Sequence, residues 1–343
     1  MENSETVLVT GGTGYVAIHT IFQLMKQGYK VKTTVRNLNR KSEVIEMLSS
    51  AGINSFENLD FVEADLSNDN NWNEAAKGCK YILHVASPFP SKEPNDENEL
   101  IRPAVDGTLR VLKAASNAGV KRVVMTSSFA AIGYSINPKN HIFTEVDWTD
   151  PNAKIATYIK SKVLAEQAAW NYIKNESGKL ELTVINPVGI FGPVFGKSVS
   201  SSIQIIEQLL TGKMSSTPKL SFSVVDVRDV ADIHIKAMKS PEANGQRFLA
   251  ASDGSTSLPE IAKLLHSQPN EYAKKVTTTV LPDWVVKIVA YFKPELKSVS
   301  TQLGKVKVLS NKKAKEMLGW QPRDKETTII DTAESLIKFG IIK

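Results

Sequence analysis

The sequence predicts an α/β protein with a doubly wound parallel sheet and a smaller, mainly C-terminal α/β lobe. In the first half of the chain, short runs of apolar and β-branched residues alternate with helical patterns. A glycine-rich turn joins the first run to the first helical pattern, and past Pro187 the alternation gives way to glycine, proline and serine between Gly189 and Ser202. Alternation at this spacing favours parallel strands with helices on both faces of the sheet.

The predicted strands are short apolar runs at residues 6–9, 29–35, 59–64, 80–85, 122–125 and 181–185. The first helix runs from the glycine-rich turn to about Gly28. Another helix, over residues 104–118, is followed by Gly119, a residue type that favours helix C-termini. Further on, residues 223–227 are strand-like, and Asp229 is expected to cap the helix that follows.

These patterns divide the chain into two parts. The chain is expected to leave the sheet domain near Pro187, to return around residue 223 and to leave again near Gly245. We therefore assign residues 1–187 and 223–245 to the sheet domain. Residues 188–222 and 246–343 would then form the smaller lobe.

The composition narrows the classes of partner. The 343 residues carry a formal net charge of +6, but the basic residues are scattered, which argues against nucleic-acid binding. The acidic N-terminus shows no signal-peptide pattern, and the apolar stretch 284–292 is interrupted by Lys287 and is too short to span a bilayer. With Cys79 as the single cysteine, these features predict a cytoplasmic protein without a membrane partner, and leave monomer or homodimer open.

Residues 10–17, TGGTGYVA, form the glycine-rich turn. Gly11 can adopt the backbone angles of a tight turn, and Gly14 lets the main chain approach a pyrophosphate closely. The small Ala17 allows the helix to pack on the sheet, and the helix N-terminus offers N–H groups and partial positive charge to phosphates. Because the turn follows a strand and opens a helix, it predicts a Rossmann-type dinucleotide-binding domain.

The end of the second strand indicates which dinucleotide binds. A site for NAD places Asp or Glu there, to accept a hydrogen bond from the ribose 2′-hydroxyl. This chain has Arg36, Arg40 and Lys41 in that region and no acid between residues 34 and 41. Arg36 can bind a 2′-phosphate bidentately, and Arg40 is a second candidate ligand. The sequence therefore predicts NADPH/NADP+ as the cofactor, with a solvated basic loop as the alternative interpretation.

Tyr158 and Lys162 open a helical segment that runs to about Tyr172. A spacing of four residues places both side chains on one helix face. An ammonium beside a phenol favours the phenolate and lowers the phenol pKa from its usual value of about 10. Ser128 follows the strand at 122–125, at the edge where ligands of doubly wound sheets bind, and can donate to a carbonyl oxygen that becomes an alkoxide.

Nine segments of the chain carry a family resemblance. They are TGGTGYVA (10–17), ADL (64–66), HVASP (84–88), PAVDGT (103–108), TSS (126–128), YIKSK (158–162), NPV (186–188), VDVRDVA (225–231) and LGWQPR (318–323). In combination they resemble the extended short-chain dehydrogenase/reductases, in the branch that contains plant dihydroflavonol 4-reductases and yeast methylglyoxal/isovaleraldehyde reductases. The similarity covers nearly the whole chain.

The resemblance implies NADPH-dependent reduction of an aldehyde or ketone and a role for each matching residue. Ser128 would hydrogen-bond the substrate carbonyl, Tyr158 would protonate its oxygen as the general acid, and Lys162 would hold the nicotinamide ribose and support the phenolate. Asp65 and Leu66 would flank the adenine. The whole set implied to bind the cofactor is Gly11, Gly14, Tyr15, Val16, Arg36, Arg40, Asp65, Leu66, Val85, Ala86, Ser87, Tyr158, Lys162, Pro187 and Ile190.

Phe89 and Phe129 follow two of the strands that would line the cofactor, so they are expected to bound the substrate pocket, unless they are ordinary core aromatics. Cys79 and His84 are interpreted as structural, and the five histidines show no metal-ligand spacing, so no metal is expected. Two other functions stay open. One is a nucleotide-sugar epimerase or dehydratase that retains NAD, against which the missing acid after the second strand argues. The other is a non-catalytic NADP(H)-binding sensor, in which the tyrosine or lysine is commonly lost.

Overall fold

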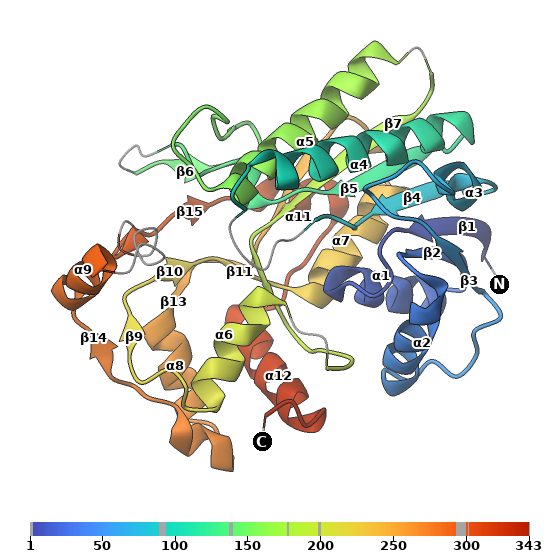
Figure 1. The fold of residues 1–343 in the computed structure, drawn as a ribbon. Helices are drawn as coiled ribbons and strands as arrows, with labels where there is room; N and C mark the ends of the chain where they lie inside the picture. The colour runs from blue at the N-terminus through green and yellow to red at the C-terminus, as the bar shows by residue number, and fades with distance from the viewer. Residues whose placement is uncertain are drawn as a thin grey trace.

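The computed structural model describes residues 3–88, 94–136, 140–176, 178–197, 200–292, 300 and 302–342. Its centre is a seven-stranded parallel sheet in the order β12-β7-β5-β4-β1-β2-β3 (Figure 1). From β1 the chain builds outward first on one side and then, from β4, on the other, which confirms the predicted doubly wound fold. The strands are β1 (Asn3–Val9), β2 (Tyr29–Val35), β3 (Leu59–Glu63), β4 (Tyr81–His84), β5 (Arg122–Thr126), β7 (Glu181–Pro187) and β12 (Arg247–Ala250).

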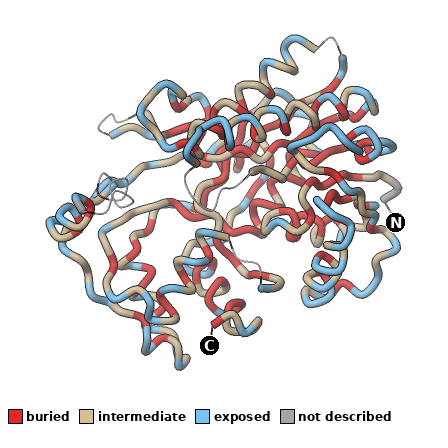
Figure 2. Tube along the Cα trace, in the orientation of Figure 1, coloured by how far each residue is buried: buried red, intermediate tan, exposed pale blue. Residues whose placement is uncertain are grey.

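Helices cover both faces of the sheet, because successive strand side chains point to opposite faces and both sets are apolar. In β1, Val7 and Val9 pack into one core and Leu8 packs into the other. The first core lies against α1 (Tyr15–Lys26), α2 (Lys41–Ser50) and α7 (Val227–Lys239). The second lies against α3 (Trp72–Ala76), α4 (Asn98–Asn117) and α5 (Thr157–Asn175). The central strands of the sheet are accordingly buried, whereas its edge strand β3 is partly exposed (Figure 2).

The smaller lobe packs three helices around Phe191: α6 (Ser201–Leu210), α8 (Leu258–His266) and α12 (Lys325–Lys338). Four two-stranded sheets connect the lobe and the loops above the main sheet. They pair β8 (Gly189–Phe191) with β11 (Val224–Asp226), β10 (Ser221–Phe222) with β13 (Thr256–Ser257), β14 (Val280–Leu281) with β9 (Thr217–Pro218), and β15 (Val308–Leu309) with β6 (Ile142–Phe143). The remaining helices are α9 (Asp283–Phe292), α11 (Lys312–Leu318) and the short η1 (Leu38–Arg40), η2 (Phe129–Ala131), η3 (Pro241–Ala243) and η4 (Glu271–Lys275).

The main sheet extends past the predicted boundary at residue 245. Strand β12 pairs in parallel with β7, Arg247 opposite Val184, and so forms the edge of the sheet. Trp320, far along the chain, is fully buried in the same core as α7, and its indole N–H donates to the carbonyl of Asp229. Four residues are too few to show a strand periodicity, so the sequence pattern placed this segment in the lobe.

Three other elements differ from the sequence prediction. Strand β11 pairs with β8 and not with the main sheet. The cap of α7 is Asp226, whose carboxylate accepts from the backbone N–H of Arg228 at 2.8 Å, whereas Asp229 lies inside the helix and accepts from the backbone N–H of Arg323 at 2.7 Å. Helix α4 begins at Asn98 instead of residue 104, because Asp96 accepts from the Asn98 N–H and starts the helix earlier.

Helix α9 covers the apolar stretch at 284–292. Val286 and Ala290 are buried on one side of it, while Trp284 and Tyr291 are exposed, so the helix is amphipathic. Among the helices in the described part of the chain, none combines the length and the apolar character needed to cross a bilayer.

Candidate active site

A cavity of about 1030 Å³ opens at the carboxyl ends of the strands and extends to the smaller lobe. Its volume is at the upper end of the range for ligand pockets, which suits a dinucleotide with a small second molecule. Sixteen of the predicted site residues line it: Gly11, Gly14, Tyr15, Val16, Arg36, Arg40, Asp65, Leu66, Val85, Ala86, Ser87, Ser128, Phe129, Tyr158, Pro187 and Ile190. Lys162 lies directly behind this lining, and Phe89 is outside the described residues.

The glycine-rich turn closes one wall of the cavity. Gly11 has φ +74°, and a Cβ built there would lie 2.9 Å from the Cβ of Ala86 at the end of β4. Gly12, which the sequence analysis did not single out, packs against β2: a Cβ there would lie 2.5 Å from Oγ1 of Thr33. Helix α1 begins directly after Gly14 and directs its first N–H groups at the cavity, where they can bind phosphate.

Cations line the cavity beyond β2. Arg36 and Arg40 both border it, and the guanidinium of Arg40 already pairs with Glu43 at 2.7 Å. Lys41 is not part of the lining; its ammonium lies 5.6 Å from the ring centroid of Phe61. The Asp65 pKa is held below its usual value by hydrogen bonds from Ser67 and by the charge of Arg36. Arg36 is thus the guanidinium best placed for a phosphate at this end.

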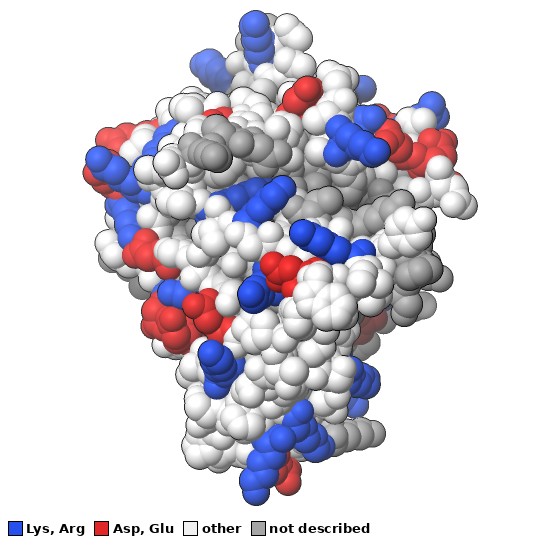
Figure 3. Space-filling model, turned by 90° about the vertical axis from the view of Figure 1, so that its left-hand side faces the viewer, with Lys and Arg blue, Asp and Glu red and all other residues white. Residues whose placement is uncertain are grey.

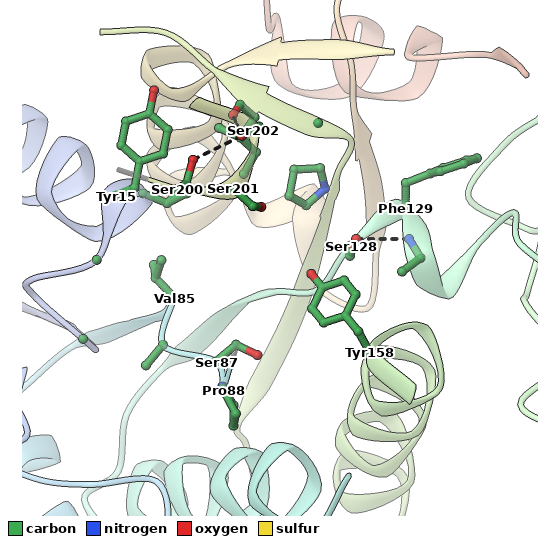
Figure 4. A pocket seen from close by; sticks show the side chains of 18 of the residues that line it. Tyr15, Val85, Ser87, Pro88, Ser128, Phe129, Tyr158, Ser200, Ser201 and Ser202 are labelled. Atoms are coloured by element: carbon green, nitrogen blue, oxygen red, sulfur yellow. Dashed lines mark hydrogen bonds between the residues drawn. The ribbon is translucent and has the colours of Figure 1, made fainter. Parts of the chain in front are cut away.

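Ser128 and Tyr158 face each other at the other end of the cavity (Figure 4). Ser128 follows β5, where its hydroxyl accepts from the backbone N–H of Ala130 at 3.1 Å and caps η2. Tyr158 is in the first turn of α5, and a hydrogen bond joins its phenol to Ser128. One turn further along, the Lys162 ammonium donates to the hydroxyl of Ser87 at 2.9 Å and lies 5.9 Å from the Tyr158 ring centroid. The fold therefore brings the three predicted catalytic groups together from two separate segments.

Burial dominates the pKa values of this group. It raises the pKa of Tyr158 to about 12, against a smaller lowering by the hydrogen bond with Ser128. It also lowers the pKa of Lys162 to about 8, opposed by the charge of Glu166. The predicted lowering of the tyrosine pKa by Lys162 is therefore wrong for the protein alone: desolvation of the phenol dominates, and the Lys162 ammonium donates to Ser87.

A buried ion pair that the sequence analysis missed supports the catalytic segment. Glu166, one turn after Lys162, accepts from Arg247 at 2.6 Å, from the Ser127 hydroxyl at 2.5 Å and from the Asn186 amide at 2.8 Å. The pair is almost fully buried, with side-chain exposures of 0% for Glu166 and 8% for Arg247. It ties α5 to the ends of β5, β7 and β12. Glu166 follows Lys162 by four residues, the same spacing that separates Tyr158 from Lys162, and this was the signal for the pair in the sequence.

Aromatic and basic side chains line the cavity next to Ser128 and Tyr158. Phe129 lines it and packs edge-on against Phe143 with ring centroids 5.6 Å apart, so this residue is both a pocket wall and a core aromatic. Tyr134 and Lys307, neither of them predicted, lie beside it. Gly133 makes room for these rings and not for a ligand, since a Cβ there would lie 2.4 Å from the Phe129 ring. Serines 200–202 at the start of α6 also enter the lining (Figure 4).

His84 and Cys79 have the structural environments expected of them. Nδ1 of His84 lies 3.0 Å from the Thr10 hydroxyl, and burial lowers the pKa of this histidine to about 3. Burial raises the pKa of Cys79 to about 11. Within the described ranges, no three His, Cys, Asp or Glu side chains gather as metal ligands would.

Residues 7–251 match the model of the NAD dependent epimerase/dehydratase family. The chain belongs to that family. This membership confirms the predicted extended short-chain dehydrogenase/reductase resemblance.

Three relatives are similar over most of their length. The ketoreductase azaE of Aspergillus niger is 30% identical in an alignment 355 positions long that covers 98% of each chain. An anthocyanidin reductase of Vitis vinifera is 34% identical over 78% of this chain and 82% of its own. The crystal structure of the yeast methylglyoxal/isovaleraldehyde reductase Gre2, complexed with NADPH, superimposes with a TM-score of 0.79 and 27% identity over 98% of this chain and 99% of its own. All three relatives are named as reductases.

Proposed function

We propose that the protein reduces an aldehyde or ketone to an alcohol by direct hydride transfer from NADPH. The observation that carries this proposal is the cluster of Ser128, Tyr158 and Lys162 at one end of a cavity whose other end has a glycine-rich turn and Arg36. The reductase names of the relatives and the NADPH in the Gre2 structure support it.

The residues present fit NADPH. The close approach of Gly11 to Ala86 leaves no room for a side chain where the pyrophosphate would pass, and the N–H groups of α1 open beside it. Arg36 replaces the acid that would bind the 2′-hydroxyl of NAD. The absence of that acid also disfavours an epimerase or dehydratase that retains NAD, although the family is named for such enzymes.

The chain's own groups account for the proton and the charge. When bound, NADPH supplies the hydride to the carbonyl carbon and leaves as NADP+. Tyr158 gives its phenolic proton to the carbonyl oxygen, and Ser128 donates a hydrogen bond to that oxygen as negative charge develops. An alkoxide is a much stronger base than a phenolate, so this proton transfer is favourable even with the Tyr158 pKa near 12. Lys162 stabilises the resulting phenolate and is placed to bind the nicotinamide ribose.

The replacement Arg36→Ala is expected to raise the KM for NADPH by about 10-fold to 100-fold, because a charge-assisted hydrogen bond contributes about 1.5–3 kcal/mol. The KM for NADH should change little, since NADH has no phosphate for Arg36 to bind. Steady-state kinetics with both cofactors measure the two effects. Arg40→Ala is the matched control and should have a smaller effect, because Arg40 is already paired with Glu43. An equal rise of KM for both cofactors would contradict the assignment.

Carbonyl reduction is expected to slow as the pH rises above about 8, where Lys162 loses its proton. The charged ammonium is the active form of Lys162. Because its pKa is lowered, the charge is lost at a lower pH than in an ordinary lysine, and the rate falls as the pH rises. Tyr158 stays protonated over this range because its pKa is about 12. The measurement is kcat/KM against pH for the wild type and for Lys162→Arg. The arginine variant keeps its charge and should show no such decline; a decline shared by both would assign the titration to another group.

The proposed function itself is tested by following NADPH absorbance, with NADH in parallel, across methylglyoxal, isovaleraldehyde, aromatic ketones and a dihydroflavonol. Oxidation of NADPH with any of these supports the reductase. Tight NADPH binding without turnover across the panel would favour the sensor instead. NAD+ retained in the purified protein would favour the epimerase or dehydratase.

A further inference from the structure

Two lysines at the substrate end of the cavity have no part in the mechanism above. Lys305 and Lys307 lie just before the short strand β15, and both line the cavity together with Leu309. The valines that alternate with them, Val306 and Val308, are 56% and 52% exposed. A strand segment at a protein surface normally turns its apolar residues inward and its charged residues outward. Here Lys307 is partly buried between two exposed valines, whereas Lys305 is exposed, so it is above all the Lys307 side chain that turns into the cavity.

Two contacts hold Lys307 at this position. Its ammonium donates to the carbonyl of Gly133 at 2.7 Å and lies 3.8 Å from the ring centroid of Tyr134. Since an ammonium has three N–H donors, this contact leaves donors for a ligand. Burial, followed by the charge of Lys305, lowers the pKa of Lys307 to about 8, and no carboxylate contributes to the shift. A bound anion would supply the missing counter-charge.

The position of Lys307 relates it to the substrate and not to the cofactor phosphates. Its aromatic partners are Phe129, the residue after Ser128, and Tyr134, six residues after Ser128, and both line the cavity. Tyr134 is also close enough to Tyr158 to raise the pKa of that residue. The cations for the cofactor, by contrast, are Arg36 and Arg40, which follow β2. Tyr134 thus contacts Lys307 on one side and influences Tyr158 on the other, which places Lys307 at the substrate end of the cavity.

The charge balance of the cavity is consistent with an anionic substrate. Among the described residues of the lining, the one carboxylate is Asp65, which follows β3 at the adenine end. The substrate end has two cations and no acid in that part of the lining. Lys and Arg side chains lie across the middle of the molecular face shown in Figure 3, with Asp and Glu side chains among them, so the excess of cations is a feature of the cavity lining and not of this face as a whole. Lys305 and Lys307 in the lining would attract an anion toward Ser128 and Tyr158.

We propose that Lys307, assisted by Lys305, binds an anionic group of the carbonyl substrate, a carboxylate or a phosphate. This inference rests on the proposed reductase function and narrows its substrate class to oxo acids and other acidic aldehydes or ketones. Lys307 is thus a specificity-determining residue and takes no part in the proton transfer.

The test compares 4-formylbenzoate with its neutral methyl ester, which has the same aldehyde and no charge. For the wild type we expect kcat/KM to be about 10-fold or more higher for the acid, because a site built to bind a charged group discriminates against an analogue without it. Lys307→Met should lower kcat/KM for the acid by about 10-fold to 100-fold, and it should change kcat/KM for the ester by less than about 3-fold. A third aldehyde, 4-formylphenyl phosphate, shows whether phosphate is preferred to carboxylate.

Lys313→Met is the matched control. Lys313 also lies over an aromatic ring, 5.4 Å from the centroid of Phe248, and burial also lowers its pKa, but it does not line the cavity. This variant should leave the preference for the acid unchanged. The inference is overturned, while the reductase function stands, if Lys307→Met lowers kcat/KM equally for the acid and the ester. It is also overturned if the wild type shows no preference for either acidic aldehyde over the ester.

A second readout separates this inference from the proposed function. Binding of 4-formylbenzoate to the protein with NADP+ can be measured by titration calorimetry, without turnover. Binding to the wild type that Lys307→Met weakens by about 10-fold or more would support the anion site even if none of the aldehydes were reduced. Equal binding by the two proteins, or no binding to the wild type, would overturn it.

Discussion

Replacing Tyr158 with phenylalanine is expected to lower kcat by about 1000-fold, because a positioned general acid contributes about 10²–10⁴ to the rate. The phenol lines the cavity, and its hydroxyl is hydrogen-bonded to Ser128. Phenylalanine keeps the ring and loses only the proton and the hydrogen bond. The measurement is kcat at saturating NADPH, with a carbonyl compound that the wild type reduces.

Binding of NADPH is the control for this variant. Lys162 and the glycine-rich turn are untouched, so the dissociation constant of NADPH, followed by fluorescence, should stay within about 3-fold of the wild type, a change of less than 1 kcal/mol. A kcat within about 10-fold of the wild type would show that the proton comes from elsewhere. Tyr134 is then the group to replace in addition, since it is the phenol close to Tyr158.

Local sequence was sufficient to predict the parts of the site that lie at strand ends. Arg36 follows β2 directly, and Ser128 lies just beyond the end of β5, so the strand positions alone place both at the carboxyl edge of the sheet. The spacing of Tyr158 and Lys162 places both on one face of α5. The fold class followed from the same alternation of strands and helices.

Contacts between distant segments could not be predicted in this way. Arg247 reaches Glu166 across 81 residues, and Lys307 reaches Gly133 across 174. Neither Lys307 nor Arg247 belonged to a motif, and the strand β12 that carries Arg247 is too short for a periodic pattern. Desolvation was equally invisible: the raised pKa of Tyr158 comes from burial by the whole fold and not from its neighbour four residues away.

Removal of the buried carboxylate in Glu166→Ala is expected to lower the free energy of unfolding by about 3–5 kcal/mol. The alanine leaves the Arg247 guanidinium buried without its counter-charge, and the Ser127 hydroxyl and the Asn186 amide lose their acceptor. Oδ1 of Asn186 and Nη2 of Arg247 already have no hydrogen-bond partner in the described structure, so the network has little capacity to rearrange. Urea unfolding, followed by tryptophan fluorescence, measures the loss.

The double variant Glu166→Leu/Arg247→Met separates an unpaired charge from the mere loss of packing. Replacing both partners of a buried ion pair with apolar residues is often neutral for stability, whereas removing one partner leaves the charge of the other buried and unpaired. The double variant should therefore be more stable than Glu166→Ala by about 2 kcal/mol, although the carbonyls of Glu145 and Asp147 lose their contacts with Arg247. If it is no more stable than the single variant, the charge of Arg247 is not the cause, and the lost hydrogen bonds of Ser127 and Asn186 must account for the effect.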